Sequence, residues 1–505
     1  MIPAAERLPD APRLIDQFGY FVVHAPRQTG KTTTLRALAQ KLTAAGTHAA
    51  LHFSCEAGEV PGEDYGAAED IVLTTIAGAA HVLPADLRPP PWPGAPPGQR
   101  ISAALTAWAR ACPKPLVLFF DEIDALRGQS LITVLRQLRA GYPDRPGGFP
   151  ASVILCGLRD VRDYKAAAGG DPTRLGTSSP FNIKVESMRL GNLRLEEVAA
   201  LYGQHTADTG QTFTPEAVHR AMEVTGGQPW LVNALGREIV EKMAVPPAEP
   251  ITAAHVDEAK ERLILARATH LDSLVHKLME PRVRRVIEPL VAGGDLRLDE
   301  TYNDDVSYVA DLGLVLTRPL RVANPIYKEV IVRVLASGAE DAIRDEPSAF
   351  VLPDGRLAFR RMMRAFGRFW REHGEVLATH MPYPEAGPQL VLMAFMQRIV
   401  NGGGYIDREY GVGRGRVDLL VRYPYSKKDG TRAEQRRALE VKVWRKGEKN
   451  PLKQGLSQMD AYLAGLGMSR GTLVIFDARG GLARQRVRYE DVVTKRGKQV
   501  RVMWA

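Results

Sequence analysis

The segment that most constrains the fold is HAPRQTGKTT, residues 24–33, which lies between a strand pattern and a helix pattern. The preceding FVVHA is β-branched and aromatic, and the following KTTTLRALAQKL repeats leucine at helical spacing. In a strand–loop–helix unit of this kind, successive main-chain N–H groups and the helix dipole form a binding site for anions. The segment therefore predicts a phosphate-binding loop of the GxxxxGK[ST] type, in which Ala25 replaces the first glycine.

This loop is expected to hold the phosphates of ATP. Lys31 would reach the β- and γ-phosphates, and the hydroxyl of Thr32 would be a ligand of Mg²⁺. The predicted nucleotide-binding residues are Pro26, Arg27, Gln28, Thr29, Gly30, Lys31, Thr32, Thr33 and Asp121.

A second buried strand pattern, LVLFF, ends in the acidic segment DEID. Asp121 at its end would hold the Mg²⁺ ion through water, and Glu122 would polarise the attacking water as a catalytic residue. Asp124 would support both from behind. The alternative is an acidic loop that is solvated after a core strand.

Two further segments bear on the nucleotide. ILCG, residues 154–157, runs into LRDVRDY, where Arg159 and Asp160 are candidate sensors of the γ-phosphate and equally candidates for surface ion pairs. TGGQPWLVNAL, residues 225–235, has glycines and a proline that would start a lid helix near the nucleotide.

The alternation of strand and helix patterns predicts an α/β fold with a doubly wound parallel sheet over residues 1–192. Strand patterns then stop. We expect a helical lid over 193–270, a winged-helix-like unit over 271–338 and a linker with helical segments over 339–378. A second α/β domain follows over 379–505.

The loop APRQTGKTT, the acidic strand end VLFFDEID, the apolar strand before GLRD and the helix GGQPWLVNAL together resemble AAA-like ATPases of the STAND and archaeal ATPase group. The resemblance covers about residues 10–340. It implies a P-loop core with a helical lid and a winged helix, ATP and Mg²⁺ as ligands, and nucleotide-dependent switching. It also implies self-association into a homo-oligomer, but it assigns no arginine finger.

A second set of chemical residues lies near the C-terminus. Asp418 stands in GRGRVDLLV, and Glu440 and Lys442 stand in ALEVKVW, which are strand patterns. Residues two apart on a strand face the same side, so Glu440 and Lys442 point together, and a neighbouring strand would add Asp418. Two carboxylates suit Mg²⁺ or Mn²⁺ better than zinc. Lys442 would position a water or stabilise charge on a phosphate.

Helical segments add polar residues around this set. QGLSQMDAYL places Gln458 and Tyr462 four residues apart on one helical face, and Glu385 opens an upstream helix. In this order the residues resemble the PD-(D/E)XK nuclease superfamily and the QxxxY motif of its RecB-like branch. The resemblance implies a metal-dependent phosphodiesterase with Asp418 and Glu440 as metal ligands. The implied catalytic residues are Glu385, Asp418, Glu440, Lys442, Gln458 and Tyr462.

The charge of the chain fits a nucleic-acid partner, with DNA ranked above RNA. The net charge is +9 and the pI is about 9.3, and basic residues interleave with aromatic ones in the C-terminal domain. A solvated basic face is the alternative. Three scattered cysteines support neither a zinc site nor disulfides, so a reducing cytoplasm is expected. The longest apolar runs are too short to span a bilayer, so no membrane partner is expected.

Two functions follow from these patterns. The first is a protein that binds and hydrolyses ATP and cleaves DNA with a divalent metal, with the ATP state controlling assembly or access. A role in prokaryotic defence would fit this architecture. The second is an ATP-switched DNA-binding or scaffold protein whose nuclease fold is catalytically silent.

Overall fold

The computed structural model describes residues 4–158, 183–266, 274, 276–291, 304–340, 347–374, 387–400, 405–412, 415–427, 431–479 and 487–505. The chain forms two compact units. The first comprises Met1–Leu265 with Val309–Val315, and the second comprises Ala266–Tyr308 with Leu316–Ala505. Each unit has its own β-sheet and its own apolar core.

The first unit contains a parallel five-stranded sheet with the order β2-β3-β4-β1-β5. Its strands are β1 (Phe21–His24), β2 (Ala49–Ser54), β3 (Leu116–Asp121), β4 (Ser152–Gly157) and β5 (Glu186–Arg189). Every residue of β3 and β4 is buried, as expected for parallel strands that are covered on both faces.

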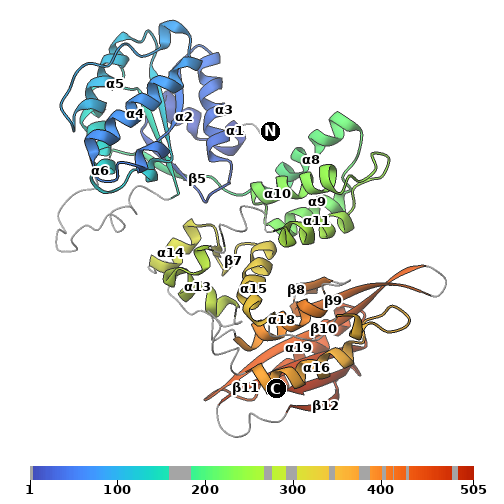
Figure 1. Ribbon diagram of the computed structural model, residues 1–505. Helices are drawn as coiled ribbons and strands as arrows, with labels where there is room; N and C mark the ends of the chain where they lie inside the picture. The colour runs from blue at the N-terminus through green and yellow to red at the C-terminus, as the bar shows by residue number, and fades with distance from the viewer. Residues whose placement is uncertain are drawn as a thin grey trace. The chain divides into compact units, whose positions relative to one another are not determined.

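Helices cover both faces of this sheet (Figure 1). One face is covered by α4 (Tyr65–Ala79), α5 (Arg100–Ala111) and α6 (Gly128–Gly141), and the other by α2 (Ala11–Asp16) and α3 (Lys31–Ala44), with the short α1 (Ala4–Arg7) beside α3. The doubly wound α/β fold predicted from the sequence is confirmed for this part of the chain.

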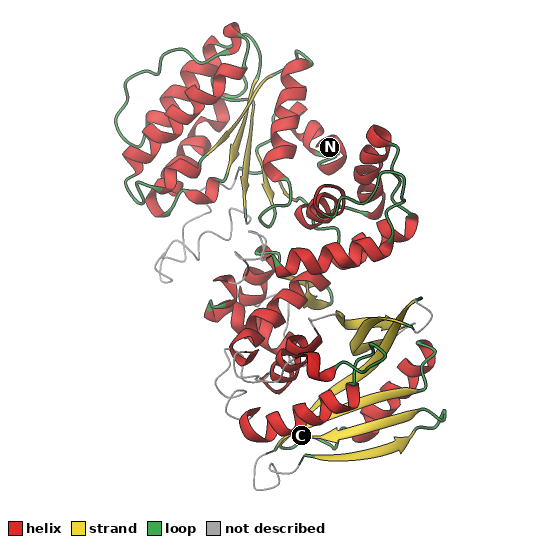
Figure 2. Ribbon diagram, turned by 45° about the vertical axis from the view of Figure 1, so that its right-hand side comes forward, coloured by secondary structure: helices red, strands yellow, loops and turns green. Residues whose placement is uncertain are grey.

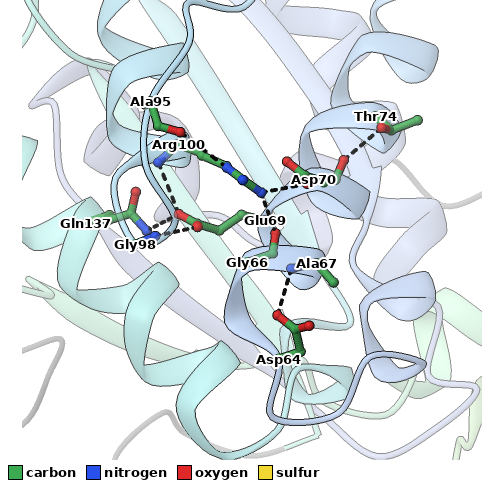
Figure 3. A network of polar contacts seen from close by, with 10 residues as sticks. All are labelled: Asp64, Gly66, Ala67, Glu69, Asp70, Thr74, Ala95, Gly98, Arg100 and Gln137. Carbon is green, nitrogen blue, oxygen red and sulfur yellow. Dashed lines mark hydrogen bonds and ion pairs between the residues drawn. The ribbon is translucent and has the colours of Figure 1, made fainter.

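The proline-rich segment between α4 and α5 is fixed by a buried acid (Figure 3). Glu69 accepts hydrogen bonds from the N–H groups of Gly98 at 2.7 Å and Arg100 at 3.2 Å, and from Nε2 of Gln137 at 2.6 Å. Arg100 also forms an ion pair with Asp70 at 2.6 Å. The three donors satisfy a carboxylate that has no exposure to solvent.

Helices follow the parallel sheet in the region where a lid is predicted. They are α8 (Leu195–Thr209), α9 (Pro215–Thr225), α10 (Pro229–Arg237) and α11 (Ala253–Leu265). Beyond them lie α13 (Pro281–Val291), α14 (Asp304–Asp311) and α15 (Pro325–Glu340), with the two-stranded sheet of β6 (Val315–Thr317) and β7 (Leu320–Val322) between the last two. Across the described part of the chain, no helix combines the length and the apolar character needed to cross a membrane.

The second unit contains a mixed six-stranded sheet, drawn in yellow in the lower part of Figure 2, with the order β12-β13-β11-β10-β9-β8. The strands are β8 (Tyr405–Val412), β9 (Gly415–Ser426), β10 (Arg432–Arg445), β11 (Arg470–Ala478), β12 (Arg488–Val493) and β13 (Gln499–Trp504). The pairs β10–β11 and β11–β13 are parallel, and the other three pairs are antiparallel.

Three helices pack on this sheet, namely α16 (Phe359–Phe369), α18 (Gly387–Val400) and α19 (Leu452–Gly465). Met459 and Leu463 of α19 pack against one face, which we call the α19 face. On the opposite face, Phe366 of α16 contacts Phe395 of α18 and Phe476 of β11. We call this second face the α16 face.

Candidate functional site

The predicted phosphate loop joins β1 to α3. The backbone turns sharply there, because Gln28 has φ 60° and Gly30, the residue before the first turn of α3, has φ 86°. Glycine tolerates such an angle, whereas most residues do not. The N-terminus of a 14-residue helix therefore points its free N–H groups into the loop.

The ammonium of Lys31 lies inside this loop. Its Nζ donates to the carbonyl oxygens of Ala25 at 2.7 Å and Pro26 at 2.9 Å. Burial lowers the pKa of Lys31 below its ordinary value. A phosphate group beside it would offset the cost of burying the charge.

The threonine and the aspartate that are predicted to hold Mg²⁺ are in direct contact. Thr32 Oγ1 donates to Asp121 Oδ2 at 2.6 Å, and His52 Nε2 lies 3.0 Å from the same oxygen. Burial raises the pKa of Asp121, but the hydrogen bonds to His52, Thr32 and Cys156, together with the charge of His52, outweigh burial and hold the pKa below its usual value. The carboxylate is therefore ionised next to the Thr32 hydroxyl.

Glu122, the predicted catalytic acid, turns toward β2. Its backbone has φ 53°, and its Oε2 accepts a hydrogen bond from Ser54 Oγ at 2.7 Å. His52 and Ser54 were not predicted from the sequence. They are the polar residues near the end of the otherwise apolar strand β2, and this pattern could have indicated them. In the sheet register His52 is paired with Phe119 and Ser54 with Asp121.

Other segments of the first unit also contact the loop. Gln228, which caps α10, donates from Nε2 to the carbonyl of Gln28 at 3.3 Å, and Arg7 donates to the carbonyl of Thr29 at 3.1 Å. The segment predicted to start a lid helix thus lies beside the loop. The candidate sensors Arg159 and Asp160 lie outside the described residues.

In the second unit, the predicted residues Glu440, Lys442 and Asp418 come together on the α19 face. Leu439 of β10 is paired with Leu419 of β9, so Glu440 and Asp418 are the next residues along the two strands. The N–H of Val441 donates to Asp418 Oδ2 at 2.8 Å, and Lys442 Nζ donates to Glu440 Oε1 at 2.8 Å. Two carboxylates and one ammonium therefore share one place on the sheet.

The carboxyl group of Glu440 is 1% exposed. Burial, followed by the charge of Asp418, raises its pKa to about 7, against the effect of Lys442. Its Oε2 is buried without a hydrogen-bond partner in the described part of the protein. Such an oxygen is costly to bury, and a divalent cation bound by both acids would give it a partner.

Two of the remaining predicted residues lie on a helix that packs on the strands of this site. Gln458 and Tyr462 lie on α19, which packs on β9, β10 and β11. Gln458 Oε1 is buried without a partner among the described residues, and Tyr462 packs against the α19-face core. Glu385 lies outside the described residues. Within those residues, no group of three or more His, Cys, Asp or Glu side chains is placed to hold a metal.

Comparison with known proteins identifies part of the first unit. Residues 15–164 match the family described as "AAA domain", a segment that contains the phosphate loop and the acidic end of β3. This part of the chain is an AAA-type P-loop ATPase domain, which binds and hydrolyses ATP. No curated protein matches the chain.

Solved structures similar to the chain include a Walker-type ATPase of Pyrococcus abyssi, with 11% identity and a TM-score of 0.46 over 66% of this chain and 96% of that one. The RuvB Holliday junction branch migration motor of Thermotoga maritima has 14% identity and a TM-score of 0.35 over 65% and 92%. A DNA replication initiation factor has 13% identity and a TM-score of 0.34 over 79% and 96%.

Proposed function

We propose that this protein is an ATP-regulated nuclease that cleaves DNA phosphodiesters with Mg²⁺ or Mn²⁺ at Asp418, Glu440 and Lys442. The observation that carries the proposal is the carboxyl group of Glu440, which is buried beside a second carboxylate and has one unpartnered oxygen. Burying such a carboxyl group costs free energy and does not stabilise the fold. A bound divalent cation would supply the missing partner for its oxygen.

The chemistry follows from the residues themselves. Asp418 and Glu440 would hold the ion, which supplies a polarised phosphate and a more acidic water when bound. Lys442, which already donates to Glu440 at 2.8 Å, would place its ammonium beside the phosphate and stabilise the charge that develops there. Gln458 and Tyr462 would orient the strand from α19, and Glu385 would add a third carboxylate.

In the ATPase domain, we infer that Thr32 and Asp121 hold Mg²⁺ with the nucleotide. Residues 26–33 would contact the phosphates, with Lys31 leaving the carbonyls of the loop for the γ-phosphate. Glu122 would act on the attacking water only after its carboxylate leaves Ser54. The ATP state would control self-assembly or access to the nuclease site, in a defence role in prokaryotes.

The proposal is tested with the full chain on single- and double-stranded DNA and RNA, with Mg²⁺, Mn²⁺ or EDTA, and with or without ATP. We expect metal-dependent cleavage of DNA that Glu440→Gln reduces at least about 100-fold, since it removes a charged ligand from the ion. Lys31→Ala should abolish ATP hydrolysis but does not change Asp418, Glu440 or Lys442. Glu434→Gln, an exposed acid on the same strand, is the matched control. DNA binding without cleavage at any metal concentration would favour the catalytically silent scaffold.

A further inference from the structure

A groove of about 920 Å³ lies on the α16 face of the C-terminal sheet, between α16 with the segment before it and strands β10 to β13. Seven arginines of the described residues line it. Arg356, Arg360, Arg361 and Arg364 come from α16 and the segment that leads into it, and Arg437, Arg470 and Arg501 come from three neighbouring strands. The groove is therefore bounded by cations on its helical wall and on its floor.

The positive charge of this groove is not neutralised within the described residues. Arg501 is paired with Asp491 by two hydrogen bonds of 2.8 Å, and Arg356 is paired with Asp354. No described carboxylate forms an ion pair with any of the remaining five arginines. An excess of guanidinium groups in one concave place destabilises the protein by mutual repulsion, and an anionic ligand would remove that cost.

Arg437 illustrates the cost. Within the described residues, this half-buried side chain donates a hydrogen bond to the main-chain carbonyl of Arg436 at 3.3 Å and to no other group. Burial, and then the charges of Arg356, Arg470 and Arg360, lower the pKa of Arg437. A guanidinium in such surroundings is poised for a phosphate, which it can bind through two parallel hydrogen bonds.

The groove also presents an aromatic side chain. Tyr489 of β12 is 38% exposed, and its hydroxyl donates to the carbonyl of Met363 at 3.1 Å. Gly367 permits this approach, because a Cβ there would lie 2.4 Å from the tyrosine oxygen. The ring is thus fixed among the arginines, and an aromatic ring among cations is the surface that single-stranded nucleic acids bind by stacking.

The groove is separate from the candidate metal site. Arg437 and Glu440 are three residues apart on β10, and an odd separation places two side chains on opposite faces of a sheet. We propose that the groove binds a single strand of nucleic acid through its phosphates and so anchors the substrate on the face opposite the metal site. The proposal rests on the proposed function only for the identity of the ligand.

The spacing of the arginines favours a strand over a compact polyphosphate. Arg360 and Arg364 lie one helical turn apart, a rise of about 6 Å. Arg437 and Arg501 lie on strands separated by β11 and are offset by two residues along them, which places them about 12 Å apart. The cations are therefore distributed over a length that several successive phosphates of an extended strand would match.

The test is the binding of a fluorescent 20-nucleotide single-stranded DNA to the full chain in EDTA, measured by anisotropy over a range of KCl concentrations. Arg360→Gln with Arg364→Gln removes two groove charges from exposed positions of α16. Arg110→Gln with Arg139→Gln removes two charges from exposed positions of α5 and α6 and is the matched control. We expect the groove variant to bind about 10-fold or more weakly and to lower the slope of log affinity against log salt by about 1.4, since each strand phosphate contributes roughly 0.7.

Two further measurements sharpen the result. Arg360→Lys with Arg364→Lys retains both charges and should restore most of the salt slope, which separates a charge effect from a folding defect. Equal DNA affinities of the glutamine variant and its control would overturn the proposal. The proposal would also be overturned if the glutamine variant lost affinity for inorganic tripolyphosphate but kept its affinity for DNA. The binding test is made in EDTA, where metal-dependent cleavage does not occur. Its result is therefore valid whether or not the protein proves to be a nuclease.

Discussion

At the scale of single residues, Glu440 makes the free energy of unfolding of the protein depend on pH. Its pKa of about 7 in the folded chain lies above the usual 4.5, so folding favours the protonated form. The stability that this preference supplies is present below pH 4.5 and is lost as the pH rises toward 7. Without metal, Glu440→Gln should therefore be increasingly stabilising relative to wild type from pH 5 to pH 8, by up to about 3 kcal/mol.

Thermal unfolding in EDTA over this pH range measures the effect. Glu434→Gln, at an exposed position of the same strand, is the control and should leave the pH dependence of the unfolding midpoint unchanged. A parallel pH dependence in wild type and Glu440→Gln would contradict the raised pKa of the buried Glu440.

The residue scale also shows how far the sequence determines the candidate sites. The contact of Glu440 with Lys442 follows from strand alternation, which is a local property. The contact of Thr32 with Asp121, 89 residues apart, was expected because the two motifs were both assigned to one Mg²⁺ ion. His52 was not predicted, because its role depends on β2 being the neighbour of β3. Strand order is a property of the tertiary fold, and neighbouring strands can be far apart in sequence.

At the scale of elements, the apolar runs of β3 and β4 predict buried parallel strands, because a strand covered on both faces needs apolar residues at every position. The arginine groove was not predicted. Its wall comes from α16, and its floor comes from strands that begin about 70 residues or more further along the chain. Only the packing of α16 on the sheet assembles these charges.

The junction between α9 and α10 depends on one glycine. Gly227 has φ +71°, its carbonyl accepts from the N–H of Leu193 at 2.8 Å, and a Cβ added to it would lie 2.0 Å from the Leu193 carbonyl oxygen. Gly227→Ala should therefore destabilise the first unit by about 3 kcal/mol or more, through strain and a backbone clash. The next residue, Gln228, touches the phosphate loop, so ATP affinity should fall as well.

Gly210→Ala is the matched control for this prediction. Gly210 has φ +78° at the end of α8, but a Cβ there meets nothing within 4 Å, so only the backbone strain of about 1 kcal/mol is expected. Thermal unfolding and the binding of a fluorescent ATP analogue compare the two variants. If the two variants are equally stable, the clash with Leu193 does not constrain the junction between α9 and α10.

At the scale of the whole molecule, the chain forms two compact units, each with its own core, so heating should give separable transitions. Saturating Mg-ATP should raise the midpoint of the ATPase-unit transition, because a ligand at about 100 times its Kd stabilises the state that binds it by about 2.7 kcal/mol. Lys31→Ala should abolish this shift. Calorimetry resolves both transitions, and Glu440→Gln assigns the one that belongs to the C-terminal unit.

The behaviour of the second transition tests regulation. If the ATP state controls the nuclease unit, the two sites share a coupling free energy, typically about 1–3 kcal/mol, and the coupling is reciprocal. Mg-ATP should then also displace the C-terminal transition. Single-stranded DNA held in the arginine groove should change the ATP affinity by the same factor by which ATP changes the DNA affinity. A C-terminal midpoint that is identical with and without Mg-ATP, together with an ATP affinity indifferent to DNA, would mean that the two units work independently. ATP control of cleavage would then have to act through self-assembly alone, which the dependence of cleavage on protein concentration would detect.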